Sequence, residues 1–281
     1  MTTTRQSFGE ALNFIVTNRL PRRLATRLVG RISKSERWPV APLALWLWRR
    51  FCDVDLGDAA TTRFRSLHDG FTRALVPGAR HFQGGSRDLC SPCDAIVGAH
   101  GLIGDGEVLQ LKGMPYRLTD LVGPALIERM AGGSYLTLRL TAGMYHRLHA
   151  PSDLVLETVE HVPGDCWNVN PPALARVRNL YCRNERAVLT ACTWSGAPLV
   201  LVPVAAILVA GIHLHALGLL RGGVRQAVEL SYQAGDELGW FEHGSTIVML
   251  LPPELQFTPL VEAGKAILAG NLVARFEPLD E

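Results

Sequence analysis

The stretch WFEHGSTIVMLL, residues 240–251, constrains the fold of this chain more than any other part of the sequence. Aliphatic and β-branched residues run from Thr246 to Leu251 and stop at two prolines, which is the pattern of a buried strand. A second apolar segment ends at Phe241. The sequence therefore predicts two strands separated by a tight break at residues 243–246 (HGST), with the break held at both ends.

The break carries groups that can react with each other. Gly244 has no Cβ, so its carbonyl can adopt backbone geometries that are closed to other residues. Ser245 places a hydroxyl within reach of that carbonyl, and attack of the hydroxyl on it is the local chemistry of self-cleavage. A Gly-Ser-Thr sequence between strands is also an ordinary turn, so this stretch alone leaves both interpretations open.

Charge is distributed unevenly along the 281 residues. The first 50 residues contain ten Arg or Lys against Glu10 and Glu36, a net charge of +8, whereas the whole chain carries +2 and the remainder therefore −6. No compact apolar core with a small-residue cleavage site follows the N-terminus, so we expect no secretory signal and a cytoplasmic protein. The hydrophobic content of 48% is enough for one large domain or two small ones.

Residues 7–51 have the apolar spacing of helices with basic faces. Their second half is apolar, contains Trp38, Trp46 and Trp48, and ends on two arginines. It is too short to span a bilayer, which takes about 20 apolar residues, but indole rings and arginines favour membrane interfaces. A helix packed on the main domain and a basic face for nucleic acid are the alternatives. The many Trp and Leu side chains favour an anionic membrane surface as the partner, and no nucleic acid.

Short strands with Gly and Pro breaks begin near residues 53–62. We therefore predict an α+β fold, with a basic amphipathic helical membrane-association segment at residues 1–55 and a β-rich catalytic domain at residues 56–281. The apolar run 199–212 contains a proline and a glycine and predicts two buried strands with a bend. A helix is expected near 65–74, and further strands at 95–97, 107–111, 135–140, 154–161 and 228–232.

Two further stretches carry groups suited to catalysis. MYHRLHAP puts His146 and His149 three residues apart, and two close histidines can bind a metal, but no third ligand is evident nearby. In SPCDAIVG, Asp94 stands at the entry to an apolar strand, where a lone aspartate is also a common turn residue. Together with Ser245 they supply the parts of an arrangement in which an aspartate orients a histidine that deprotonates a serine.

The cysteines do not form the pattern of a metal site. Cys90 and Cys93 make a C-x-x-C pair, but neither a second pair nor a His-x-His partner lies at zinc spacing. We expect no metal, and free thiols at all six positions: Cys52, Cys90, Cys93, Cys166, Cys182 and Cys192.

Several motifs in one order give the sequence a family resemblance. HGST resembles LGST, the self-cleavage motif of the phosphatidylserine decarboxylases, and YHRLHAP is similar to the family's YHRVHMP. SPCDA resembles its PADG or SPVDG, and VPGDCWNVN and RNERAVL resemble its VPGDLxxVN and NER segments. LQLKGMPYRLTDLV also follows the family pattern, so the resemblance covers about residues 55–255. The chain departs from the pattern at Ala95, Ala150 and His243, which leaves the three candidate catalytic residues in place.

The resemblance implies a proenzyme that cuts itself. Ser245 would attack the carbonyl of Gly244 and end as a pyruvoyl cofactor at the start of a small subunit, residues 245–281. Residues 1–244 would form the large subunit, which stays with the small one as its partner. Phosphatidylserine would be the substrate, with phosphatidylethanolamine and CO2 as products. A homodimer is possible, and the expected location is peripheral, on the cytoplasmic face of the cell membrane.

The same resemblance implies a role for each of the other candidate residues. His149 is the base for Ser245, Asp94 orients His149, and His146 holds the substrate carboxylate or delivers a proton. Two alternatives from other classes stay open. One is a pyruvoyl-dependent decarboxylase of another amine-bearing acid, which would not need the amphipathic N-terminal segment. The other is a non-enzymatic, membrane-associated β-domain in which HGST is only a turn.

Overall fold

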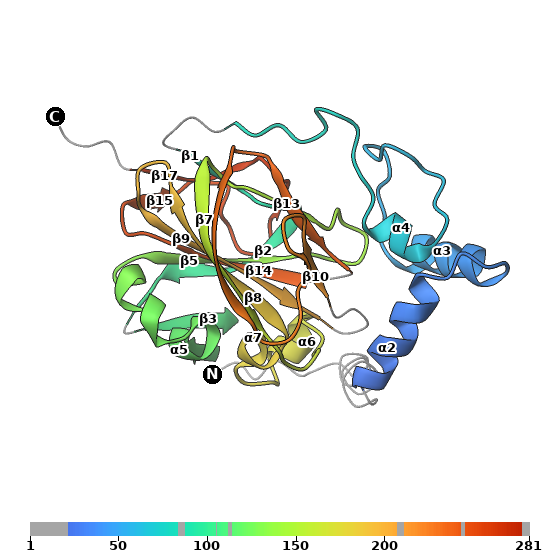
Figure 1. The fold of residues 1–281 in the computed structure, drawn as a ribbon, viewed down its shortest axis with the longest axis horizontal. Coiled ribbons are helices and arrows are strands. Elements are labelled where there is room, and N and C mark those ends of the chain that lie inside the picture. Colours follow the sequence, from blue (N-terminus) through green and yellow to red (C-terminus); the bar gives the residue numbers. More distant parts are fainter. Residues whose placement is uncertain are drawn as a thin grey trace.

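The computed structural model describes residues 22–83, 88–104, 106–111, 114–206, 211–242 and 245–276, and the side chains within them except those of residues 22–25, 27, 111 and 245. Figure 1 shows a β-rich body with helices α2, α3 and α4 grouped at one side of it. The predicted α+β class with a β-rich core is confirmed. The domain boundary between residues 55 and 56 stays a prediction.

The largest sheet has eight strands, and every neighbouring pair in it is antiparallel. In spatial order its strands are β12 (Arg225–Tyr232), β7 (Leu154–Val162), β8 (Arg186–Thr193), β9 (Pro198–Ala205), β14 (Ser245–Leu251), β5 (Ser134–Arg139), β2 (Ala95–Leu102) and β16 (Ala266–Ile267).

Three smaller sheets complete the β structure of the described residues. A four-stranded sheet contains β11 (Gly218–Leu219), β10 (Ile212–Leu214), β13 (Glu237–Phe241) and β6 (Arg147–His149). A three-stranded sheet contains β1 (Asp88–Cys90), β17 (Leu272–Phe276) and β15 (Leu255–Phe257). A separate pair is formed by β3 (Glu107–Leu111) and β4 (Met114–Arg117).

The helices are short and fall into two groups. At one side of the body are α2 (Arg22–Ser33), α3 (Val40–Phe51) and α4 (Leu67–Phe71). Against the large sheet lie α5 (Leu118–Val122), α6 (Pro171–Leu174) and α7 (Leu180–Arg183), with the 3-10 turns η1 (Pro124–Leu126) and η2 (Glu128–Met130). Within the described part of the chain, no helix is both long and apolar enough to cross a membrane.

β14 lies inside the large sheet, between β9 and β5, and both of its faces are covered. Ile247 and Met249 pack in a core shared with the smaller sheets, whereas Val248 and Leu250 pack in a second core with the α5–α7 layer. All four side chains are fully buried, and each such burial stabilises the fold by roughly 1.5–3 kcal/mol. The continuous apolar run at this position in the sequence is thereby explained.

The structure corrects the predicted break. Ser245 and Thr246 already belong to β14, so the break is shorter than HGST, and residues 243 and 244 lie outside the described residues. β13 and β14 also belong to different sheets, so the chain crosses from the four-stranded to the eight-stranded sheet at this point. The break therefore joins two independently held strand ends.

Most other predicted elements are present. The run 199–212 covers most of β9 and the first residue of β10, and the predicted bend is not tested because residues 207–210 lie outside the described part. The helix expected at 65–74 is the shorter α4, which begins after Ser66, whose side chain accepts the Asp69 N–H at 3.1 Å. Of the helices predicted for residues 7–51, α2 and α3 are confirmed, and residues 7–21 lie outside the described residues.

Candidate active site

His146 and His149 lie beside the strand that leads into the break. β6 pairs antiparallel with β13, and His149 stands opposite Glu237 in this pairing. The Phe241 N–H donates to the carbonyl of His146 at 3.0 Å. Both histidines are thus tied through the backbone to β13, whose last residue stands three positions before Gly244.

Asp94 reaches the same region from a third segment of the chain. It stands directly before β2, and the nearby carbonyl of Pro92 accepts the His149 N–H at 2.8 Å. Three separate sequence motifs therefore meet here. The backbone of Ser245 begins β14 opposite Ala205. The Ser245 side chain and the whole of Gly244 lie outside the described residues, so the site of cleavage stays a prediction.

Asp94 is held by Arg80, a residue that the sequence analysis missed. Arg80 Nε donates to Asp94 Oδ1 at 2.8 Å and Nη2 donates to Oδ2 at 2.5 Å, while the Ala269 N–H adds a bond to Oδ1 at 2.9 Å. These bonds raise the pKa of Arg80, and a bidentate arginine fixes the plane of the carboxylate. A single arginine in a connection rich in Gly and Pro has no pattern by which it could have been found.

The contacts of His149 fix its proton. Its Nδ1 lies 2.8 Å from the carbonyl oxygen of Gly235, which can only accept, so Nδ1 carries the hydrogen. Burial lowers the pKa of His149, so the ring is neutral near pH 7 and Nε2 bears a lone pair. That lone pair accepts the hydroxyl of Tyr145 at 2.9 Å, because burial raises the pKa of Tyr145 and keeps its proton on. His149 is thus in the form of a general base.

Asp94 and His149 do not share a direct hydrogen bond in this structure. Each ring nitrogen of His149 already has another partner, and both oxygens of Asp94 are bonded to Arg80. The Arg80 guanidinium lies 5.9 Å from the centre of the Tyr145 ring, so Arg80 and Tyr145 connect the two residues. Tyr145 stands in the MYHRLHAP stretch with His149, whereas Arg80 lies in a distant loop, so no local sequence pattern predicts that these two side chains meet.

His146 has an unpartnered nitrogen in the interior of the protein. The side chain is fully buried, and its Nδ1 lies 2.8 Å from the carbonyl oxygen of Met144. Burial lowers the pKa of His146 to about 3, so the ring is neutral with its hydrogen on Nδ1. Its Nε2 has no hydrogen-bond partner among the described residues. Buried polar atoms are nearly always paired, so this atom is a candidate for contact with a ligand.

Arg147, between the two histidines, is structural. Its Nη1 lies 2.9 and 2.8 Å from the two carboxylate oxygens of Glu237 on β13. Its Nε and Nη2 donate to the carbonyl of Thr72 at the end of α4. The residue therefore ties the histidine segment both to the neighbouring strand and to the helical group.

The NER segment supports the strand beside Ser245. Asn184 is fully buried, and its Nδ2 donates at 2.8 Å to the carbonyl of Ala205, the residue opposite Ser245. The Glu185 carbonyl accepts the Ala205 N–H at 2.8 Å. Arg186 donates to the carbonyls of Leu121 and Asp120 near α5 and so anchors the segment from behind. These residues fix the start of β14 through its neighbour β9.

No group of three His, Cys, Asp or Glu side chains that could hold a metal ion is found among the described residues. The two close histidines instead use Nδ1 to bond backbone carbonyls. All six cysteines are free thiols, as predicted.

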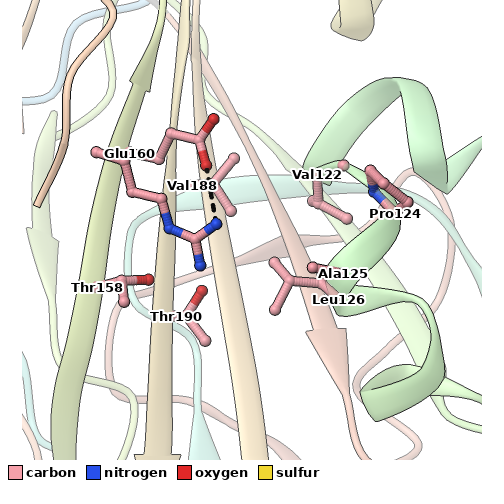
Figure 2. Close-up of a pocket in the computed structure, with 10 residues that line it drawn as sticks. Val122, Pro124, Ala125, Leu126, Thr158, Glu160, Val188 and Thr190 are labelled. Atoms are coloured by element: carbon pink, nitrogen blue, oxygen red, sulfur yellow. Dashed lines mark ion pairs between the residues drawn. The ribbon is translucent and has the colours of Figure 1, made fainter. Parts of the chain in front are cut away.

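A cavity of about 160 Å³ lies elsewhere, between the large sheet and the α5–η1 segment. Figure 2 shows Thr158, Glu160, Val188 and Thr190 on its sheet side and Leu126 opposite, with the dashed ion pair between Glu160 and Arg225. Thr190 pairs with Val200, which pairs with Leu250, at the far end of β14 from Ser245. Leu250 and Ser245 are about 17 Å apart along β14, so the cavity is not part of the histidine site.

Known proteins resemble this chain over most of its length. The family model for phosphatidylserine decarboxylase matches residues 67–275. Curated relatives similar to this chain carry the name phosphatidylserine decarboxylase proenzyme. The one from Methylibium petroleiphilum is 36% identical and the alignment covers 96% of this chain and 99% of the relative. Those from Variovorax paradoxus and Brevibacillus brevis are 35% and 32% identical, each covering 92% of this chain and 95% of the relative. The chain belongs to the phosphatidylserine decarboxylase family.

Proposed function

We propose that this chain is a proenzyme that cuts itself between Gly244 and Ser245 and then decarboxylates phosphatidylserine to phosphatidylethanolamine at a membrane surface. The observation that carries the proposal is the state of His149: neutral, with Nε2 unprotonated, on a strand paired with β13. The relatives described above are named as proenzymes of this activity. The intact mass of the purified protein is the first test, because a single uncut chain contradicts the proposal.

His149 performs the first step of cleavage. Its Nε2 takes the proton of the Ser245 hydroxyl as the oxygen attacks the Gly244 carbonyl, and the peptide bond becomes an ester. Elimination then releases the Gly244 carboxylate and leaves a dehydroalanine at position 245. Addition of one water and loss of ammonia convert this residue into a pyruvoyl group. In the precursor the Tyr145 hydroxyl occupies Nε2, so it must give way to the serine before reaction.

The residues near the break fit a pyruvoyl group. Such a group supplies a ketone that takes up an amine and a conjugated carbonyl that accepts an electron pair as CO2 leaves. The chain around it must offer polar contacts to the substrate's carboxylate, and the buried, unpartnered Nε2 of His146 is one. The backbone carbonyl of His146 accepts a hydrogen bond from the N–H of Phe241, the last residue of β13, and this bond ties His146 to the strand before the cut.

His146 acts on the substrate through a change in its charge. Without substrate its pKa is lowered to about 3 by burial, so Nε2 carries no proton. An incoming carboxylate favours the charged imidazolium and raises that pKa. Nε2–H then holds the carboxylate, and its proton is available to the carbon that loses CO2. Met144, by accepting from Nδ1, keeps the ring oriented for both tasks.

The His146→Ala variant should therefore cleave at close to the wild-type rate and lose decarboxylation by about 10²–10⁴-fold, the usual cost of removing a positioned acid or base. The measurements are the fraction of cut chain on a denaturing gel and CO2 release from phosphatidylserine vesicles. A variant that remains uncut would show that His146 serves Ser245, which would contradict the division of roles between the two histidines.

The helical group presents an apolar surface suited to a membrane. Trp38 is 85% exposed, Trp46 58% and Phe51 72%, whereas Trp48 is buried and donates from Nε1 to the carbonyl of Ala142 at 2.8 Å. Trp48 therefore anchors α3 to the body, whereas Trp46 in the same helix and Trp38 before it face outward. Exposed aromatic side chains beside Arg49 and Arg50 suit an anionic lipid surface. The cytoplasmic face of the cell membrane is the proposed location, and a homodimer stays a prediction.

We expect the protein to sediment with anionic vesicles, and salt to weaken this binding without abolishing it. Salt screens the arginines, whereas burial of indole and aliphatic area in the interface persists. Trp46→Ala should reduce the bound fraction several-fold. Trp194→Ala is the matched control, because Trp194 is also exposed (46%) but follows β8 in the body. Equal binding to neutral and anionic vesicles would refute the electrostatic contribution.

A further inference from the structure

Glu242 is a buried carboxylate directly before the break. It follows β13 and is 7% exposed. Its Oε2 lies 2.5 Å from Nζ of Lys34 and 3.7 Å from Nδ1 of His68. The next two residues are those outside the described part, and Ser245 follows them. Because a strand advances about 3.3 Å per residue, Glu242 lies within about 10 Å of Ser245.

The partners of Glu242 come from the helical group. Lys34 follows the last residue of α2 and precedes α3, and His68 is in α4. The backbone of Glu242 is held from the opposite direction, since its N–H donates to the carbonyl of Gly211 at 3.1 Å. The last described residue before the break is thus fixed both by the β body and by the helices, and Figure 1 shows α2–α4 on the β10 side of the body.

Space around Glu242 is tight. A Cβ on Gly211, which has φ +144°, would come within 2.7 Å of Glu242 Cγ. Glu242 Cγ therefore packs closely over the backbone of Gly211 on this side. A buried carboxylate that loses its cation must take up a proton or move toward water, so loss of Lys34 destabilises the native position of Glu242.

We propose that Lys34 is a positioning residue for self-cleavage, because it holds Glu242, the last described residue before the proposed cut. This inference rests on the proposed function. It makes maturation depend on docking of the helical group, because Lys34 lies in the turn between α2 and α3. The helices that face the membrane thereby take part in forming the active enzyme.

The test follows cleavage over time in freshly made full-length precursor. Lys34→Met should slow cleavage on the order of 10–100-fold, since small displacements of reacting groups have effects of this size. Lys34→Arg, which keeps the cation, should cleave at close to the wild-type rate. The exchange Lys34→Glu with Glu242→Lys should cleave faster than either of its single variants. Restored cleavage on exchange is a result that mere loss of packing does not give.

Arg65→Met is the matched control. Arg65 pairs with Glu36 at 3.5 Å in the same helical group, but both side chains are exposed, so this variant should cleave like the wild type. Lys34→Met that cleaves at the wild-type rate overturns the inference and leaves the proposed function intact. An exchange variant no faster than its single variants also overturns it. A wild-type chain that never cleaves removes the proposed function instead, so the two failures are distinct.

Discussion

The Ser245→Ala variant is expected to remain one full-length chain, whereas the wild type separates under denaturing conditions into residues 1–244 and 245–281. Alanine has no hydroxyl to attack the Gly244 carbonyl, and a peptide bond without a positioned nucleophile is inert on this timescale. Intact mass distinguishes the two proteins directly. The small wild-type fragment should also be blocked to N-terminal sequencing, because its first residue carries a ketone in place of an amine.

The control for this variant is Ser231→Ala. Ser231 is an exposed serine on the edge strand β12, so its loss should leave cleavage at the wild-type level. A wild-type chain that stays whole, or a small fragment that begins with an ordinary serine, would contradict the pyruvoyl cofactor and with it the proposed reaction.

Cleaved fragments should stay together under native conditions. β14 opens the small fragment and lies between β9 and β5, with side chains from Ile247 to Leu251 fully buried. The fragment also supplies β17, which pairs with β1 of the large one. Separation would expose all of this apolar surface, at roughly 1.5–3 kcal/mol for each large side chain. We therefore expect the two fragments to remain associated after the chain is cut.

The strands of this fold could be predicted because their signals are local. Apolar runs bounded by Gly and Pro placed β3, β5, β7 and β14 to within a residue or two of their ends. These local signals could not predict that β13 and β14 belong to different sheets. It depends on which distant strands each one meets, and periodicity along the chain contains no information about partners.

The sequence motifs of the candidate site could be predicted, but the side-chain contacts that link them could not. Asp94 and His149 were proposed because each stands in a recognisable stretch, and their segments do meet. Tyr145 stands in the same stretch as His149, but Arg80 lies in a distant loop without a comparable pattern, so its pairing with Asp94 and its contact with Tyr145 could not be predicted. Glu242 differs again. Its importance arises from burial and from an ion pair with a residue about two hundred positions away, and neither can be read from one sequence.

His149→Ala should slow self-cleavage by about 10²–10⁴-fold, the second of the two largest effects. Serine is a poor nucleophile near neutral pH unless a base takes its proton, and His149 offers a neutral ring with an unprotonated Nε2 on a strand paired with β13. Asp94→Asn should impair cleavage less, because Asp94 acts on His149 through Arg80 and Tyr145. His100→Ala is the matched control, since His100 lies on β2 against Phe257.

The pH dependence of cleavage tests the same role independently. The reactive form is neutral His149, and burial lowers its pKa from the usual value near 6.5. The cleavage rate should therefore stay on its plateau as the pH falls from 8 through 6.5, and decline only at lower pH, where Nε2 takes up a proton. An exposed histidine would lose half its activity already near pH 6.5. A midpoint at or above 6.5 in the wild type, or a His149→Ala variant that cuts as fast as the wild type, would show that another group deprotonates Ser245.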